Sequence, residues 1–173
     1  EGSIVFQVGD KVIDRNGRVY RVETKTNKDF GSGPVSYLVL APCFSYDQSP
    51  EYRCFIPFSN QETLLHPIMS KKDCLDLIDS WNLLDTFDDQ NARERKNHAQ
   101  LIIQSGKRKD LCKAIKSLRI YKAEREKENK PFSDSDRKLL VSLQSVFNDE
   151  VSIVLGIPKN EVDSFIQNRV SGL

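Results

Sequence analysis

The sequence is poor in the residues and motifs that mark the common enzyme classes. Only two histidines occur among its 173 residues. His66 precedes a proline and His98 lies in a basic run, and neither has neighbours that would make it a metal ligand or a general base. No glycine-rich phosphate loop, dinucleotide fingerprint, zinc-protease motif or nucleophile elbow is present. The sequence therefore predicts a protein that is not an enzyme and that uses no cofactor, metal or small-molecule substrate.

Cysteines and long apolar runs are also scarce. The four cysteines are Cys43, Cys54, Cys74 and Cys112. They form no C-x-x-C pair, and their spacings fit neither a zinc site nor a disulfide scaffold. Neighbouring strands could bring Cys43 and Cys54 together, but core thiols are the simpler interpretation. No apolar run approaches the roughly 20 residues that span a bilayer, and no export signal is recognised, so we expect a cytoplasmic protein that does not bind membranes.

Positive charge is distributed unevenly along the chain. The formal net charge is only +1, yet the window from Arg93 to Lys122 holds ten Lys or Arg residues and two acids, Glu94 and Asp110. This local excess of eight positive charges is typical of a surface that binds a polyanion such as nucleic acid. A solvated helix surface is the alternative explanation, although acids usually interleave with the bases on such a surface.

The first part of the chain has the pattern of short β-strands. Asn16-Gly17, between two strand-like runs, predicts a tight hairpin because both residues tolerate positive φ. The segments 27–36 and 43–51 are expected to be long exposed loops. About five short strands in residues 4–69 predict a small antiparallel barrel or a strongly bent sheet. The strand-like runs are Val12-Ile13, residues 19–22, residues 37–40 and residues 54–57.

From Ser70 onward the apolar residues follow a helical period. We expect a compact bundle of about five helices, which makes the fold class α+β with domains at residues 1–69 and 70–173. Trp81 is expected in the core or at the domain junction, and Asp149-Glu150 on the solvated surface. The expected helix boundaries are Ser70 to about Trp81, Asp88-Asp89 to Gly106, a third helix that includes residues 111–118 and runs to Lys130, Ser133 to Gly156, and a last helix from Pro158.

Several short motifs, taken in order, resemble those of the CarD/CdnL family of bacterial transcription regulators. Each motif alone is common, but the ordered set spans nearly the whole chain. In the first half the motifs are Phe6-Gln7-Val8-Gly9-Asp10-Lys11-Val12, Val22-Glu23-Thr24-Lys25-Thr26, Tyr37-Leu38-Val39-Leu40, Ile56-Pro57, Asn60 and Pro67-Ile68-Met69-Ser70. In the second half they are Gln104-Ser105-Gly106, Ala114-Ile115-Lys116-Ser117-Leu118, Phe132-Ser133, Leu139 and residues 149–156.

The resemblance implies a Tudor-like RNA-polymerase-interacting domain at residues 1–69 and a helical DNA-binding domain at residues 70–173. Members of this family dock a strand edge on the β subunit of RNA polymerase. They contact promoter DNA near the upstream edge of the transcription bubble and stabilise the open complex. The implied partners are therefore the polymerase β subunit and promoter DNA, mostly its phosphate backbone, and the implied location is the nucleoid.

The resemblance also selects candidate contact residues. Lys25 matches a basic residue of the family's polymerase face, and Phe55 stands where the family has a second one. Arg53, two residues before Phe55, is expected on the same face and can take the place of that residue. The candidate DNA contacts are Arg93, Arg95, Lys96, Lys107, Arg108 and Lys109, followed in second rank by Lys113, Lys116 and Arg119.

One departure from the family bears on mechanism, and three alternatives stay open. Many members place a wedge tryptophan at the start of the basic helix, where this chain has Asn91 or Ala92, so phosphate binding is better supported than bubble stabilisation. The helices can instead bind protein and not DNA. An RNA-binding protein would show exposed aromatics beside basic residues, a pattern hinted at by Tyr52 and Phe55. An enzyme would show a polar pocket with converging ionisable groups.

Overall fold

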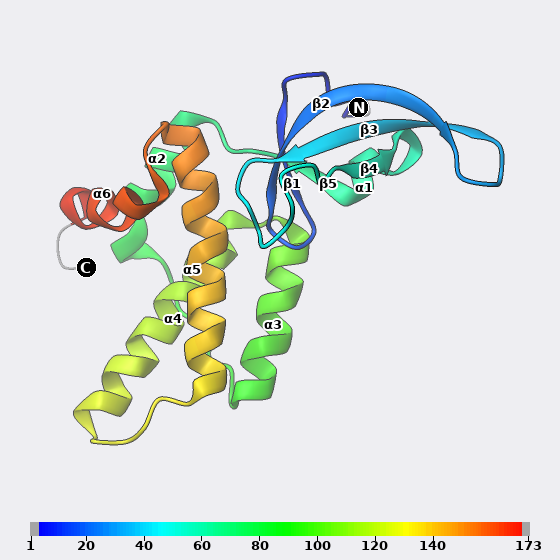
Figure 1. Ribbon diagram of the computed structural model, residues 1–173. Helices are drawn as coiled ribbons and strands as arrows, with labels where there is room; N and C mark the ends of the chain where they lie inside the picture. Colours follow the sequence, from blue (N-terminus) through cyan, green and yellow to red (C-terminus); the bar gives the residue numbers. More distant parts are fainter. Residues whose placement is uncertain (1–3, 171–173) are drawn as a thin grey trace. The chain divides into compact units, whose positions relative to one another are not determined.

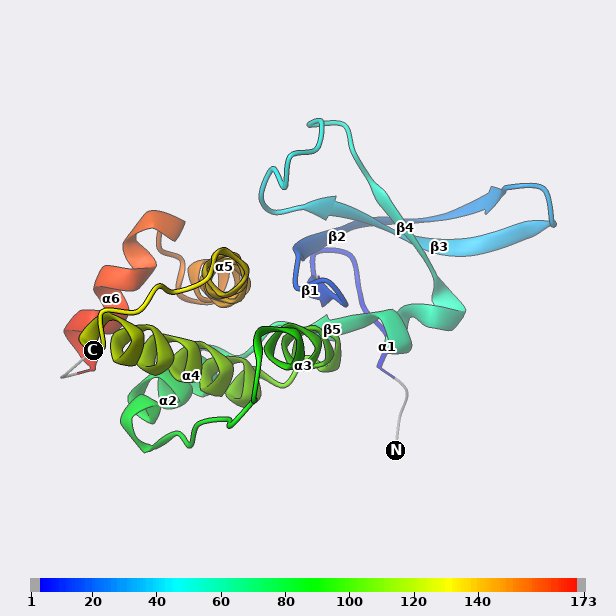
Figure 2. The same ribbon diagram turned by 90° about the horizontal axis from the view of Figure 1, so that it is seen from below.

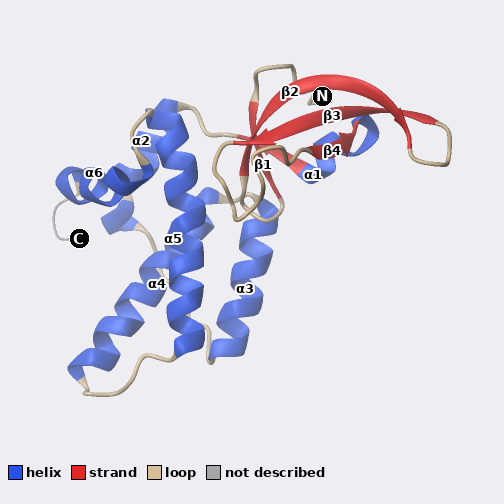
Figure 3. Ribbon diagram, viewed as in Figure 1, coloured by secondary structure: helices blue, strands red, loops and turns tan. Residues whose placement is uncertain are grey.

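The computed structural model describes residues 4–170 (Figure 1). The chain divides after Ile68 into two compact units, one built mainly of strands and the other of helices (Figure 3). We call residues 4–68 the sheet unit and residues 69–170 the helical unit. The fold class is α+β, as predicted, and the division lies one residue from the expected boundary.

The sheet unit contains a five-stranded antiparallel sheet whose two longest strands, β2 and β3, curve together along its length (Figures 1 and 2). Its core lies on one face and includes Val12, Tyr20, Val22, Leu38 and Leu40. The strands are β1 (Lys11–Asp14), β2 (Val19–Asp29), β3 (Pro34–Pro42), β4 (Cys54–Pro57) and β5 (Leu65–Pro67), in the spatial order β4-β3-β2-β1-β5.

The sheet is open, so the predicted barrel closure is not observed. The edge strands β4 and β5 do not pair with each other. The chain between them forms the 3₁₀ helix η1 (Phe58–Asn60) and the short helix α1 (Gln61–Leu64). Phe58 and Leu64 pack on the core, and the buried Gln61 side chain accepts a hydrogen bond from the Phe6 backbone N–H at 3.0 Å. This helical segment covers the apolar core. Because residues 58–64 are helical, they do not form a strand that could close the sheet into a barrel.

The hairpin predicted at Asn16-Gly17 is present, whereas the loop expected at 27–36 is mostly strand. Gly17 has φ +80°, and Asp14 Oδ1 accepts the backbone N–H groups of Asn16 and Arg18 at 2.9 Å each. The β2–β3 ladder continues to Asp29 and Pro34. Asp29 Oδ1 then accepts the N–H groups of Gly31 and Gly33 at 2.8 and 3.1 Å, which closes a tight turn and removes the need for a long loop.

A β-bulge interrupts β2 at Glu23. Val22 pairs with Leu40 on β3, but the next pair joins Thr24 to Val39, so Glu23 has no partner opposite it. Side chains alternate between the two faces of a strand, and an extra residue changes which face the following residues occupy. The bulge therefore sets the facing of every β2 residue between Thr24 and Asp29.

The helical unit contains five α-helices among the residues described, which agrees with the prediction. Ser70 caps α2 and Ser133 caps α5 through their hydroxyls, as expected. The predicted start at Asp88-Asp89 is wrong, because Asn91 caps α3 by accepting the Glu94 N–H at 2.9 Å. The helices are α2 (Lys71–Asp79), α3 (Ala92–Ser105), α4 (Arg108–Lys127), α5 (Asp134–Leu155) and α6 (Val162–Arg169), with 3₁₀ turns η2 (Trp81–Leu83) and η3 (Lys159–Glu161).

The core of the helical unit buries Trp81, Cys74 and Cys112 among aliphatic residues of all five helices. The cysteines are free thiols, and burial raises the pKa of Cys74 to about 11, as expected for structural thiols. Among the described residues no single helix is both long and apolar enough to cross a membrane; only the bent pair of α5 and residues 159–169 reaches that length and composition when the two are counted together.

We expect Leu143→Ala to destabilise the helical unit by about 3 kcal/mol, because Leu143 is fully buried and truncation leaves a cavity. Trp81 is the only tryptophan and lies in this core, so its fluorescence during urea unfolding reports the helical unit. The matched control is Val141→Ala on the same helix, 62% exposed, which should cost less than about 0.5 kcal/mol. Similar losses in both variants would contradict the assignment of Leu143 to the core.

Candidate nucleic-acid interface

The basic run lies on α3 and the first half of α4. Gly106 ends α3 in the left-handed conformation at φ +68°, and α4 begins two residues later at Arg108. Both helices pack against α5, whose buried residues include the acids Asp136, Asp149 and Glu150. The interpretation of Asp149-Glu150 as solvated surface charge is therefore wrong, because these side chains lie inside the helical unit.

Arg95, one of the predicted DNA contacts, points inward and is held by Asp136. Its Nε and Nη2 donate to the two carboxylate oxygens at 2.8 and 2.7 Å. The Asp136 side chain is only 2% exposed and that of Arg95 16%. The guanidinium also lies 4.5 Å from the ring centre of Tyr121. Since the pair is bidentate and buried, Arg95 is committed to the fold.

Burial opposes ionisation of Asp136, but hydrogen bonds from Arg95 and Ser133 and the charge of Arg95 outweigh it. The pKa of Asp136 is therefore lowered below its ordinary value. A carboxyl group whose pKa is lower in the folded chain than in the unfolded chain stabilises the fold above its unfolded pKa, about 3.9. That stabilisation is lost as the pH falls through the folded value.

Arg108 forms a second buried ion pair of the same kind. Its Nε and Nη2 donate to the carboxylate of Glu150 at 3.0 and 2.9 Å. One oxygen of Glu150 also accepts the Met69 backbone N–H at 2.8 Å. The carboxylate thus joins the start of α4 to the start of the helical unit, and Arg108 is as fully committed as Arg95.

The three second-rank residues on α4 are also engaged inside the unit. The Lys113 ammonium lies 4.8 Å from the ring centre of Phe87, and Lys116 Nζ donates to the carbonyls of Trp81 and Leu84 at 3.1 and 2.7 Å. Arg119 lies 5.4 Å from the Trp81 ring, and burial lowers its pKa. These contacts anchor the chain around Trp81 to α4, so these cations are poor candidates for a nucleic-acid contact.

Four of the nine predicted contacts remain exposed. Arg93 and Lys96 lie on α3, and Lys107 and Lys109 lie at the start of α4. In the part of the chain that the structure describes, none of these four forms an ion pair. The fold therefore divides the nine predicted contacts into five structural cations and four that face solvent.

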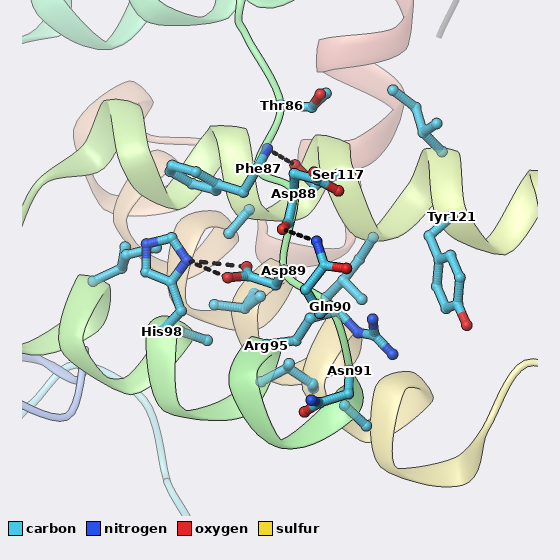
Figure 4. Close-up of a pocket in the computed structure, with 18 of the residues that line it drawn as sticks. Thr86, Phe87, Asp88, Asp89, Gln90, Asn91, Arg95, His98, Ser117 and Tyr121 are labelled. Carbon is cyan, nitrogen blue, oxygen red and sulfur yellow. Dashed lines mark hydrogen bonds and ion pairs between the residues drawn. The ribbon is translucent and has the colours of Figure 1, made fainter.

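A cavity of about 650 Å³ lies beside α3 and α4, under residues 86–91 (Figure 4). His98 Nδ1 lies 3.0 and 3.2 Å from the Asp89 carboxylate oxygens, and its ring meets Phe87 edge to face at 4.4 Å. Ser117 Oγ accepts the Phe87 N–H at 2.8 Å. A polar pocket with ionisable groups was the expected mark of an enzyme, but in this one His98 is paired with Asp89 and Arg95 with Asp136. These contacts hold the segment that leads into α3.

The Asp89–His98 pair was not predicted, because Asp89 was assigned to a helix cap. A carboxylate nine residues before a histidine is a weak signal, since the two meet only where the intervening chain turns back. The actual cap at Asn91 leaves Asp89 outside the helix and free to reach His98. Identification of Asn91 as the N-cap residue would have indicated that Asp89 lies outside the helix and can reach His98.

The sheet unit separates the predicted polymerase contacts. Lys25 pairs with Leu38, which in turn pairs with Ile56 on the core face, whereas Phe55 pairs with Val39 on the opposite face. The expectation that Phe55 and Lys25 share a face is therefore wrong, because the bulge at Glu23 changes the alternation. Lys25 Nζ donates to Gln7 Oε1 at 3.3 Å and lies 5.3 Å from the Phe58 ring.

Arg53, the third predicted contact, forms an ion pair with Glu23 at the bulge. Its guanidinium also donates to the carbonyls of Tyr52 and Pro50 at 2.8 and 3.2 Å. Neither Arg53 nor Lys25 is thus an isolated surface cation. Of the three predicted contacts, Phe55 is the one that offers an apolar side chain, and it is 37% exposed.

Phe55 belongs to an exposed aromatic cluster with Phe30 and Tyr37. The three rings meet edge to face, with centroids 5.5 Å apart for Phe30–Tyr37, 6.0 Å for Phe30–Phe55 and 6.1 Å for Tyr37–Phe55. Phe30 is 67% exposed. Sequence reasoning missed Phe30 and Tyr37 because only strand register brings them beside Phe55. The cluster adds an apolar surface next to the open edge of β4.

Comparison with known proteins finds no family model and no curated protein that matches this chain. The resemblance to the CarD/CdnL family therefore rests on the sequence motifs alone.

We expect Asp136→Asn to destabilise the helical unit by about 3 kcal/mol at pH 7, because it leaves the Arg95 guanidinium buried without its charge partner. Urea unfolding followed by Trp81 fluorescence measures this. The difference from the wild type should begin to shrink below about pH 4, the pKa of the unfolded carboxyl group, and should keep shrinking as the pH falls through the lowered pKa of the folded one.

The matched control is Asp134→Asn in the first turn of the same helix. The Asp134 side chain is 93% exposed and lies 3.9 Å from Arg137, so its loss should cost less than about 0.5 kcal/mol. A wild-type-to-variant difference for Asp136→Asn that stays constant from pH 7 to pH 3 would contradict the charged pair.

Proposed function

We propose that this protein is a non-enzymatic transcription regulator. It binds the β subunit of RNA polymerase through the sheet unit and promoter DNA near the upstream edge of the bubble through the helical unit, and so modulates the stability of the open complex. The motif resemblance to the CarD/CdnL family supports both contacts. The observation that carries the DNA contact is the group of four exposed cations, Arg93, Lys96, Lys107 and Lys109, without internal carboxylate partners.

Two of these cations occupy positions that are unfavourable for the isolated helix. Lys107 is the N-cap residue of α4 and Lys109 lies in its first turn. The N-terminus of a helix carries partial positive charge, so lysines there are repelled by it. A phosphate group at the same place would be attracted both by the helix terminus and by the lysines. Phosphate binding thus explains why the chain carries these residues at this end.

The internal contacts of five cations also reduce the number of DNA phosphates that the helical unit is expected to bind. Arg95, Arg108, Lys113, Lys116 and Arg119 have internal partners and are removed from the DNA-contact set. With about four phosphates contacted, log K should fall against log[salt] with a slope of roughly −3 to −4. Such binding is mostly independent of sequence, as expected for contacts to the backbone.

The proposed polymerase contact is the outer edge of β4 together with Phe55. β4 lies at one end of the sheet, and among the described strands it pairs only with β3. An unpaired edge can accept a strand from a partner, and an exposed aromatic beside it can act as an anchor. Arg53 borders this surface, whereas Lys25 lies on the other face. Joining two weak contacts in one chain strengthens both through effective concentration.

A second candidate function, RNA binding, is favoured by one observation. The strand register places the half-buried Tyr37 and the exposed Phe55 on the same sheet face as the exposed Arg21 and Lys28, and the exposed Phe30 packs against both rings. Aromatic rings beside cations on a sheet are typical of single-stranded nucleic-acid binding. Single-stranded RNA bound more tightly than duplex DNA, with loss of binding in Phe30→Ala, would favour this candidate.

We expect the double variant Arg93→Gln with Lys96→Gln to bind duplex DNA at least tenfold more weakly at about 50 mM salt, because two phosphate contacts are lost. Fluorescence anisotropy across a salt series measures this, and the slope should become shallower by about 2. The matched control removes two exposed lysines elsewhere, Lys71→Gln with Lys127→Gln. Equal losses in both double variants, or no duplex binding by the wild type at 50 mM salt, would contradict the proposed DNA contact.

We expect Phe55→Ala to reduce capture of the purified polymerase β-subunit lobe at least tenfold in a pull-down, because an aromatic anchor at an interface centre is commonly worth 2 kcal/mol or more. The matched control is Lys25→Ala, which should retain capture within about twofold since Lys25 lies on the opposite face. Undiminished capture by Phe55→Ala would defeat the proposed polymerase surface.

A further inference from the structure

The solvent-facing side of α3 has an unusual composition. Counted at 3.6 residues per turn, six of its eight exposed residues fall within an arc of about 140°, and the other two, Glu94 and Ser105, lie just beyond one edge of that arc. The six comprise two cations, three amides and one leucine. We call this set the outer face of α3; its members are Arg93, Lys96, Asn97, Gln100, Leu101 and Gln104.

The outer face of α3 contains no acid. The one acid of the helix, Glu94, is exposed and borders this face about 20° beyond Leu101, where its carboxylate accepts the Gln90 backbone N–H at 2.8 Å. The side chains of Arg93, Lys96, Asn97 and Gln100 make no ion pair or hydrogen bond within the part of the chain that is described. This face therefore presents positive charge together with the amides of Asn97 and Gln100, which have no partner among the described residues.

The opposite side of α3 is fixed to the helical unit. Arg95 is bonded to Asp136, His98 to Asp89, and Ala99 and Ile102 are buried in the core. A helix held by both a buried ion pair and apolar packing cannot rotate about its axis without breaking them. The outer face is thus presented in one orientation, which a surface that reads a ligand requires.

The chemistry of this face matches the major groove of B-DNA. The groove is about 12 Å wide and admits an α-helix, and an Asn or Gln amide can donate to and accept from one adenine. From Arg93 to Gln104 the helix rises about 16 Å. Arg93 and Lys96 stand at one end of this length, and Lys107 and Lys109 follow the other end. Cations can therefore meet the phosphates on both walls while the amides face the bases.

Leu101 supports the same ligand. Its side chain is 65% exposed although it lies between polar residues. Single exposed leucines are common on protein surfaces, but at this position Leu101 can meet the methyl group of thymine, which is an apolar contact in the major groove. The outer face thus combines the groups that distinguish an A·T pair from a G·C pair.

We infer that α3 is a recognition helix that lies in the major groove and selects A·T base pairs through Asn97 and Gln100, with Leu101 against a thymine methyl group. This inference rests on the proposed DNA contact and goes beyond it, because backbone binding carries no sequence information. Arg93 and Lys96 supply affinity, and the amides supply selectivity.

The test is selection of binding sites by the full chain from a pool of random 20-base-pair duplexes, followed by anisotropy on the selected and scrambled sites. The wild type should enrich a short A·T-containing site and bind it about tenfold more tightly than the scrambled duplex. Asn97→Ala with Gln100→Ala should lose this preference while binding the scrambled duplex within about twofold of the wild type. Arg93→Gln with Lys96→Gln should bind both duplexes more weakly and keep the preference.

The outcomes separate this inference from the proposed function. Duplex binding by the wild type without any enriched site would overturn the recognition helix and leave the backbone contact standing. Retained preference in the Asn97 and Gln100 double variant would also overturn it. Failure of the wild type to bind any duplex would overturn both. Trp81 fluorescence confirms that each variant is folded.

Discussion

The buried pair of Arg95 and Asp136 is the interaction on which the arrangement of the candidate interface depends. It turns one cation of α3 inward and so fixes which side of the helix faces solvent. The Arg108–Glu150 pair does the same for the start of α4. The two acids are 150 − 136 = 14 residues apart on α5, or about 21 Å of helix. One helix, α5, therefore carries both of the acids that hold α3 and the start of α4 in place.

The sorting of the basic run explains why local charge is an incomplete guide to binding. Ten cations in a window of the sequence predict a polyanion site, yet five of the nine predicted contacts are structural. The partners of Arg95 and Arg108 are Asp136 and Glu150, which lie about 40 residues later in the sequence. The other three cations contact aromatic rings or backbone carbonyls, which carry no charge that a sequence would reveal. A buried acid behind a basic helix is the feature that separates the two kinds of cation, and only tertiary structure reveals it.

Much of the fold followed from local chemistry. The caps at Ser70 and Ser133, the glycine stops at Gly106 and Gly156 and the turn at Asn16-Gly17 each depend on a few adjacent residues, and all were predicted. What failed depended on pairing across the chain: the open sheet, the facing of Lys25 and the aromatic cluster. Alternation assigns faces only while it is uninterrupted, and one unpaired residue, Glu23, was enough to reverse it.

That bulge has a consequence for how the sheet unit can change over evolutionary time. Since each β2 residue faces the same side as its partner on β3, loss of Glu23 would remove the bulge and leave Lys25 opposite Leu38 on the core face. Pairing of Glu23 with Val39 in an uninterrupted ladder would instead bring Lys25 to the side of Phe55 and move Thr24 and Thr26 toward the core. The register at this point is thus as much a determinant of what the sheet displays as the residues themselves.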